Sequence, residues 1–234
     1  MIDDFVREAH GTPFVFITMY PWSGLNEKPY MDGRTTLYLV KEGGEVAYPY
    51  HKMKLIPFSE YLPGEDKFPV LRSIFPFVGQ ITAGEKMNCI ELGKKLCVVP
   101  LICYDGIFPD FVRQFAIQGG NVLLCLDNDT NFGLTKASEV HFSVMIYRAI
   151  ENRMPMIRVS NSGPSLTVFS NGRVLSGSET KMYKKDFRAV TILPGDLRTT
   201  IYQQGGWQFP YFILGIFFIV LFCEYCFLGK IRRQ

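Results

Sequence analysis

Three side chains in this sequence have the chemistry of a nucleophilic site, and the first of them is Cys103. An apolar run that opens at Val98 ends at Cys103, and a Tyr-Asp-Gly turn follows directly. This pattern predicts a buried strand, a tight elbow and a helix, with one thiol at the junction. Backbone N–H groups and the helix dipole at such a junction favour a thiolate. We therefore predict that Cys103 is a nucleophile.

A nucleophilic cysteine also needs a base or a cation beside it, and donors for the oxyanion formed on attack. A Cys–His pair is poorly supported by the positions of the three histidines, His10, His51 and His141. Lys52 is the better candidate, because a lysine near Cys103 would stabilise the thiolate and the oxyanion. Glu60 lies eight residues past Lys52 and is predicted to orient the lysine or to handle protons.

Two residues after the cysteine are predicted to serve the same chemistry. The backbone N–H of Tyr104 is a second oxyanion donor, and Asp105 is predicted to orient the backbone or the substrate. Arg148 and Glu151 lie three positions apart on a predicted helix. We expect them to form a structural pair that braces the elbow.

The polar loop 127–133 follows a predicted strand, and Asn128 within it is expected to have a structural role near the site. The acids of this loop lack the glycine and the distal glutamate of a calcium-binding loop. We therefore expect no metal, and nothing in the sequence calls for a cofactor.

The elements that position these residues follow an α/β pattern. The elbow lies between strands predicted at 96–102 and 121–126, with a helix at 111–118, which makes a βαβ-like unit. A hairpin of strands 35–40 and 45–50, joined by Glu-Gly-Gly at 42–44, leads directly to Lys52. The other predicted elements are helices 2–10 and 138–152 and strands 13–19, 89–92, 156–160, 166–169, 173–175 and 187–193.

Length and composition limit the classes of protein that this chain can be. It has 234 residues, of which 47% are hydrophobic, enough for a sizeable core. The net charge is +3 without a long block of one sign, so we expect no nucleic-acid partner. The six cysteines are scattered through mostly apolar runs, unlike those of a disulfide scaffold.

Two apolar segments stand apart from this pattern. Residues 66–80 are crowded with aromatic and aliphatic side chains, as in ordinary core filling or in a lid that dips into a membrane over a lipidic substrate. Residues 209–228 form an apolar run that would span roughly 30 Å as a helix. Basic residues follow that run, so the tail is predicted to be cytoplasmic, whereas a buried core helix is the alternative. From the acidic, non-apolar start of the sequence we expect no signal peptide there.

Four segments resemble motifs of the apolipoprotein N-acyltransferases, which are membrane members of the nitrilase (carbon–nitrogen hydrolase) superfamily. They are YHKMKLIPFSEYLP from Tyr50, PLICYDGIFPDFVR from Pro100, LDNDTNFG from Leu126 and RAIENRMPMIRVSNSGPSLTVFSNGRVL from Arg148. The segments keep the order of the family and cover residues 50–175.

The resemblance implies a nitrilase-like α-β-β-α sandwich of the α/β class, truncated at its N-terminus and followed by one transmembrane helix. The implied domains are a catalytic domain lacking its first strand at 1–200, a transmembrane helix at 207–229 and a cytoplasmic basic tail at 230–234. The implied location is the bacterial inner membrane, with the catalytic domain on the periplasmic side and the C-terminus in the cytoplasm.

The resemblance also implies a reaction. In the family, a cysteine takes an acyl chain from a phospholipid as a thioester. It then passes the chain to the α-amino group of the N-terminal diacylglyceryl-cysteine of an apolipoprotein. By motif position Cys103 is the nucleophile, Lys52 is the triad lysine and Glu60 is an additional glutamate. The implied partners are thus a phospholipid donor, an apolipoprotein acceptor and the membrane.

Departures from the motifs keep other possibilities open. The triad glutamate of the family precedes the helix in which this sequence starts, so we expect the general base and the N-terminal membrane helices to be missing. Ser59 replaces a glycine, Asp105 replaces a glutamate and Asn131 replaces a tryptophan. The alternatives are a carbon–nitrogen hydrolase acting on a small amide or nitrile, which Asp105 weakly favours, or an inactive fragment.

Overall fold

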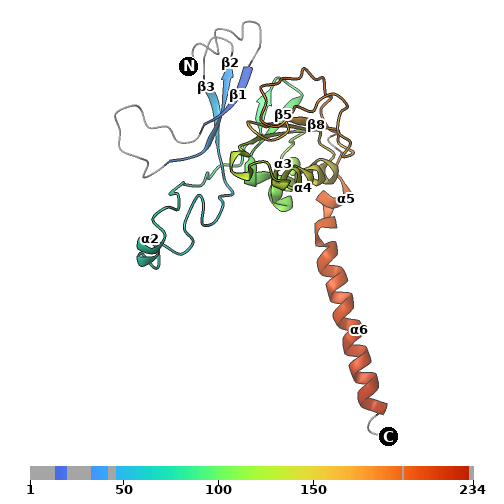
Figure 1. Ribbon diagram of the computed structural model, residues 1–234. Coiled ribbons are helices and arrows are strands. Elements are labelled where there is room, and N and C mark those ends of the chain that lie inside the picture. Colours follow the sequence, from blue (N-terminus) through green and yellow to red (C-terminus); the bar gives the residue numbers. More distant parts are fainter. Residues whose placement is uncertain (1–13, 20–32, 42–45, 197, 232–234) are drawn as a thin grey trace. The chain divides into compact units, whose positions relative to one another are not determined.

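The computed structural model describes residues 14–19, 33–41, 46–196 and 198–231, and the chain divides into two compact units, 1–197 and 198–234. The first unit holds two β-sheets, and two of its helices lie against the second sheet (Figure 1). The second unit holds the long C-terminal helix. The predicted helix 2–10 and the turn at 42–44 lie outside the described residues.

The first sheet is antiparallel and has the strand order β1-β2-β3. Its strands are β1 (Phe14–Met19), β2 (Thr36–Lys41) and β3 (Val46–His51), close to the predicted bounds. Leu37 and Leu39 of β2 are buried in the core of the unit. Because β3 ends at His51, Lys52 is the first residue beyond the sheet.

The second sheet has the order β4-β5-β6-β7-β8, with three parallel strands at its centre and an antiparallel strand at each side. Every residue of β6 is buried, as expected of a central strand in a parallel sheet. The carboxyl ends of β5 and β6 meet at one edge, which brings Cys103 and the loop after Asp127 together. The strands are β4 (Ile90–Leu92), β5 (Leu96–Ile102), β6 (Val122–Asp127), β7 (Met156–Ser160) and β8 (Leu166–Val168).

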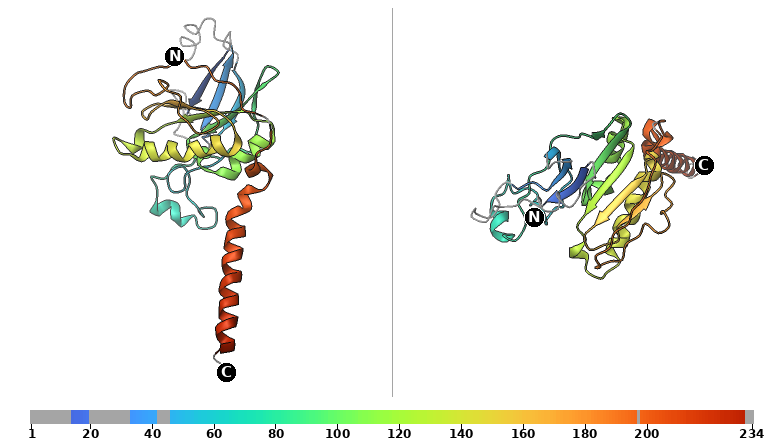
Figure 2. Two further views of the ribbon diagram at one scale, coloured as in Figure 1. Left: turned by 90° about the vertical axis from the view of Figure 1, so that its right-hand side faces the viewer. Right: turned by 90° about the horizontal axis from the view of Figure 1, so that it is seen from above.

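Two helices, α3 (Pro109–Ile117) and α4 (Ala137–Asn152), lie side by side along the second sheet (Figure 2). α3 begins with a proline. The first N–H groups of a helix have no intrahelical acceptor, so the N–H that proline lacks costs no hydrogen bond there. Met145 and Ala149 on α4 pack into the same core cluster as the central strands, so a continuous core underlies the carboxyl edge.

Three predictions of local structure are wrong or incomplete. No strand forms at 187–193, where Phe187 and Leu193 are 85% and 83% exposed, because a local apolar pattern alone does not supply a neighbouring strand to pair with. The strand predicted at 173–175 is reduced to a bridge between Val168 and Val174. The segment 66–80 contains a short helix that was not predicted, α2 (Val70–Ile74).

The C-terminal unit contains α5 (Ile201–Gln204), a 3-10 turn (Gly206–Gln208) and α6 (Phe209–Ile231). Thr200 and Gln203 cap α5 reciprocally through side chain and backbone. A helix was predicted here and is present. The membrane-spanning part of that prediction is not supported, because within the described residues no helix combines the length and the apolar character needed to cross a bilayer.

Candidate active site

The elbow at Cys103 is a strained backbone position. Cys103 follows β5 directly and has a φ of 47°, in the left-handed region that residues other than glycine seldom adopt. A 3-10 turn, η1 (Cys103–Ile107), comes next, and α3 begins only at Pro109. The predicted strand, elbow and helix are therefore present, with a tight turn inserted between elbow and helix.

Lys52 and Glu60 form a buried ion pair. The Lys52 Nζ atom lies 2.6 Å and 2.8 Å from the two carboxylate oxygens of Glu60, and the two residues are 2% and 8% exposed. Glu60 Oε2 also accepts a hydrogen bond from the Ile56 N–H at 2.9 Å. The backbone of Lys52 is fixed through its N–H to Thr35 and through its carbonyl, which accepts from the Gly84 N–H. The structure thus brings these two predicted site residues together.

Asp105 joins the lysine segment to the cysteine elbow. Its side chain is fully buried. Its two oxygens accept four hydrogen bonds, from the Tyr50 hydroxyl at 2.9 Å and from the N–H groups of Met53, Lys54 and Ile102 at 3.2, 2.7 and 3.1 Å. Burial raises the pKa of Asp105 to about 6, although these donors favour the carboxylate. Asp105 therefore fixes the backbone after Lys52 and the backbone before Cys103 relative to each other.

The electrostatics of Cys103 contradict one expectation. Burial raises the pKa of its thiol to about 12, the charge of Asp127 adds to this, and the cation of Lys52 acts in the opposite direction. The prediction that the elbow itself favours a thiolate is therefore wrong. Desolvation and the nearby carboxylates outweigh the cation of Lys52, which lowers this pKa.

A second group of polar residues lies beside Cys103, and it was not predicted from the sequence. Cys103 Sγ, a carboxylate oxygen of Asp127 and a ring nitrogen of His141 all lie within 4.8 Å of one another. Asp127 ends β6, next to the strand that ends in Cys103, so the parallel pairing was a signal that could have found it. His141 comes from α4, and its proximity depends on how that helix packs, which the sequence does not show.

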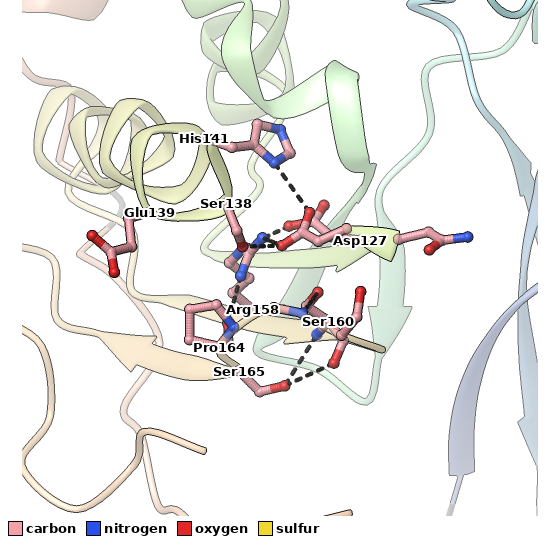
Figure 3. A network of polar contacts seen from close by, with 12 residues as sticks. Asp127, Ser138, Glu139, His141, Arg158, Ser160, Pro164 and Ser165 are labelled. Atoms are coloured by element: carbon pink, nitrogen blue, oxygen red, sulfur yellow. Dashed lines mark hydrogen bonds and ion pairs between the residues drawn. The ribbon is translucent and has the colours of Figure 1, made fainter. Parts of the chain in front are cut away.

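Arg158 holds the carboxylates of this group in place. Its side chain is buried, with Nε 2.5 Å from Asp127 Oδ2 and Nη2 2.5 Å from Asp129 Oδ2. Figure 3 shows Ser138 and His141 pointing from α4 toward the same carboxylates, whereas Glu139 points away. Burial raises the pKa of Asp127 despite its arginine partner. Burial acts the same way on Asp129, but contacts with His141, Ser138 and Arg158 lower its pKa overall.

The remaining predicted residues support the site from outside. Arg148 donates to the Ile107 carbonyl at 3.0 Å and to Glu151 at 2.6 Å, so this pair braces the turn after Cys103 as expected. Asn128 accepts hydrogen bonds from the backbone and hydroxyl of Thr130 within its own loop. The ring of Tyr104 packs edge-on against Phe108, 5.0 Å between ring centres.

A cavity of about 800 Å³ opens beside the elbow, and its lining includes Lys54, Leu62, Tyr104 and Phe108. The neighbouring segment 58–77, which we call the aromatic segment, is largely uncovered. Five of its large apolar side chains are more than half exposed, namely Phe58, Phe68, Val70, Ile74 and Phe77. Core filling therefore does not explain these five side chains.

Comparison with known proteins connects this site to a family. Residues 9–201 match the carbon-nitrogen hydrolase family. Among curated proteins, the chain is 33% identical over 190 residues to an apolipoprotein N-acyltransferase of Borreliella burgdorferi and 34% identical over 195 residues to one of Rickettsia prowazekii. Each match covers 80% of this chain and 36% of the relative, so the chain spans about a third of the length of these relatives.

Solved structures support the nitrilase-like α/β fold. A nitrilase-superfamily amidase from Nesterenkonia superposes with a TM-score of 0.52 at 20% identity, covering 78% of this chain and 58% of the amidase. A carbon-nitrogen hydrolase from Helicobacter pylori superposes with a TM-score of 0.57 at 16% identity, covering 79% of this chain and 64% of the other. At these identities the likeness concerns the fold.

Proposed function

The chain belongs to the carbon-nitrogen hydrolase family, and on this basis we propose that it takes part in an N-acyl transfer of the apolipoprotein N-acyltransferase type. The donor is a phospholipid, and the acceptor is the α-amino group of a diacylglyceryl-cysteine at the N-terminus of a lipoprotein. The observation that carries the proposal is the buried Lys52–Glu60 ion pair, whose lysine cation acts to lower the pKa of the Cys103 thiol.

In the first half of the reaction, Sγ of Cys103 attacks the ester carbonyl of the phospholipid. Because the pKa of the thiol is about 12, its proton must leave as the S–C bond forms. In net terms that proton passes to Glu60 through Lys52, whose Nζ is bonded to both carboxylate oxygens. The Lys52 cation and the Tyr104 N–H stabilise the oxyanion. The C–O bond then breaks, the lysophospholipid alkoxide takes up the proton, and a thioester remains.

In the second half, the neutral amine of the acceptor attacks the thioester carbonyl. The C–S bond breaks, the amine loses a proton and the sulfur regains one, so Cys103 returns to its starting state. A thioester is the appropriate intermediate, because a thiolate is a better leaving group than the alkoxide of the original ester. The strained elbow holds Sγ at the end of β5 during both attacks.

The surroundings of the site support a lipidic donor. The cavity next to the elbow is lined in part by the apolar side chains of Leu62, Tyr104 and Phe108, and the exposed aromatic segment lies along the same stretch of chain. Such a surface suits contact with acyl chains. We accordingly propose that the chemistry takes place at a bacterial membrane, with the catalytic unit on its periplasmic side.

The test is acyl capture. The purified chain is incubated in detergent with an alkyne-bearing phospholipid, and adducts are detected by click labelling and mass spectrometry. We expect a hydroxylamine-sensitive adduct on Cys103 that is absent from Cys103→Ala. Cys89→Ala, which removes a half-buried cysteine away from the elbow, should label normally.

The outcomes separate this function from its alternatives. Hydrolysis of small amides without any phospholipid adduct would favour a carbon–nitrogen hydrolase. Absence of both activities in folded protein would mean that residues 1–234 do not turn over by themselves. An adduct that survives in Cys103→Ala would refute the assignment of the nucleophile.

A further inference from the structure

A group of buried polar atoms beside Cys103 has no part in the proposed transfer. Asp127 Oδ1, Asp129 Oδ1 and His141 Nδ1 are buried, and within the described part of the chain none of them makes a hydrogen bond. The nearest approach is an ion-pair distance of 3.6 Å between His141 Nδ1 and Asp129 Oδ1. Buried polar atoms are normally paired, so unpaired ones at a single place indicate a missing partner.

The charges at this place indicate that the missing partner is a cation. The carboxylates of Asp127 and Asp129 are both buried, and Arg158 is the guanidinium that contacts them. With a neutral imidazole on His141, one positive charge therefore faces two negative ones when both carboxylates are ionised, and a thiolate on Cys103 would add a third negative charge. The cation of Lys52 does not fill the deficit, because Glu60 holds it in a bidentate pair. Figure 3 shows His141 directed at these carboxylates.

The donor set identifies the class of cation. Thiolate, imidazole and carboxylate together suit zinc and similar divalent transition metals, and three protein ligands leave a fourth position open. The three donor atoms already lie within 4.8 Å of one another. Ligand atoms around tetrahedral zinc are about 3.5 Å apart, so binding requires the donors to close by roughly 1 Å. The thiol proton is released to solvent as the metal–sulfur bond forms.

We propose that Cys103, Asp127 and His141 form a binding site for a zinc-class divalent cation that switches the nucleophile off. Asp129 is a positioning residue, because a carboxylate beside a ligating imidazole fixes the ring. The site departs from the expectation of no metal, which rested on calcium-loop spacing alone. The proposal that a metal binds does not depend on the proposed function, whereas the proposal that the metal inhibits the reaction rests on it.

Cobalt(II) is the probe for binding, because a thiolate ligand gives it a charge-transfer band and tetrahedral geometry gives it intense visible bands. We expect the purified full chain to show both. Cys103→Ser should lose the charge-transfer band, and His141→Gln should bind at least about tenfold more weakly. Asp127→Asn is a weaker test, since it also disturbs Arg158. Circular dichroism checks that each variant is folded.

The matched control is Cys89→Ser, because Cys89 lies beside Cys97 and that thiol pair is the competing place for a soft metal. Spectra unchanged by Cys89→Ser support the inference. A charge-transfer band that survives in Cys103→Ser, or that disappears in Cys89→Ser, would overturn it. A wild-type chain that shows no such band would also overturn it.

A second measurement separates the metal from the reaction. Zinc should slow alkylation of Cys103 by iodoacetamide at least about tenfold, with recovery on adding EDTA, and should leave alkylation unaffected in His141→Gln. Phospholipid labelling that falls with zinc supports both the function and the inhibition. Cobalt bound at Cys103 in a chain that never forms an adduct means that the function fails and the metal site stands. Labelling that persists at saturating zinc refutes inhibition.

Discussion

Removal of the Asp105 carboxylate is the sharpest test of how this site is assembled. Asp105→Ala leaves four donors without their acceptor in a position with no exposure to solvent. Each buried donor left unpaired costs about 1–3 kcal/mol, and water entering the space recovers part of it. We expect a loss of about 3–5 kcal/mol in the free energy of unfolding. Tyr50→Phe removes one of the four bonds and should cost about 1.5–3 kcal/mol.

The assay is urea unfolding followed by far-ultraviolet circular dichroism, with Cys103 alkylation as a local readout. Asp66→Ala is the control, because Asp66 is exposed and its loss should change stability by less than about 0.5 kcal/mol. Asp105→Ala should also speed alkylation of Cys103, since the elbow loses its tie to the lysine segment. The reasoning fails if Asp105→Ala lies within about 1 kcal/mol of the control or leaves alkylation unchanged.

The pKa of Asp105 adds a pH dependence with a definite sign. Its folded pKa of about 6 lies above the ordinary value of 3.8, so the native state binds this proton more tightly than the unfolded state. The contribution to stability is complete below pH 3.8 and is lost as the pH rises through about 6. The difference amounts to roughly 3 kcal/mol. Asp105→Asn should remove this component from a series of urea titrations between pH 4 and 8.

Three further predictions concern the thiol, its lysine and a glycine packed against the backbone of His51. Alkylation of Cys103 in the folded chain should keep rising by about tenfold per pH unit to pH 10, because its pKa is about 12, and a plateau near pH 8.5 would contradict this. Lys52→Met should slow alkylation and cost about 3–5 kcal/mol in urea unfolding, and adding Glu60→Gln should restore stability but not reactivity. Gly84→Ala places a Cβ against the backbone of His51 and should cost about 1–3 kcal/mol by the same assay, with unchanged stability counting against the packing.

The local pattern of apolar residues in the sequence predicted several strands and helices of the first unit close to their observed bounds. The apolar run into Cys103 became β5, the Asn121–Leu126 run became β6 (Val122–Asp127), and the amphipathic stretch near Ser138 became α4. Each of these signals lies within one element and depends on burial of one face or of the whole strand. The strand prediction at 187–193 failed because a strand also needs a neighbouring strand to pair with.

The site shows the same limit. Lys52, Glu60 and Cys103 were predicted as site residues because each stands in a recognisable local motif. The meeting of Asp127 and His141 beside the thiol depends on strand order and helix packing, which act over long separations in the sequence. The raised pKa of Cys103 was missed for a related reason, because desolvation is a property of the assembled core.

The raised pKa of Cys103 has a consequence for redox chemistry. The thiolate is the form that peroxides oxidise and that enters disulfide exchange, so a thiol with a pKa of about 12 is almost entirely unreactive at neutral pH. Sulfenic acid formation, the first step of the oxidation ladder, is suppressed for the same reason. In the oxidising compartment where we place this unit, the burial that makes the nucleophile slow to ionise also keeps it reduced between turnovers.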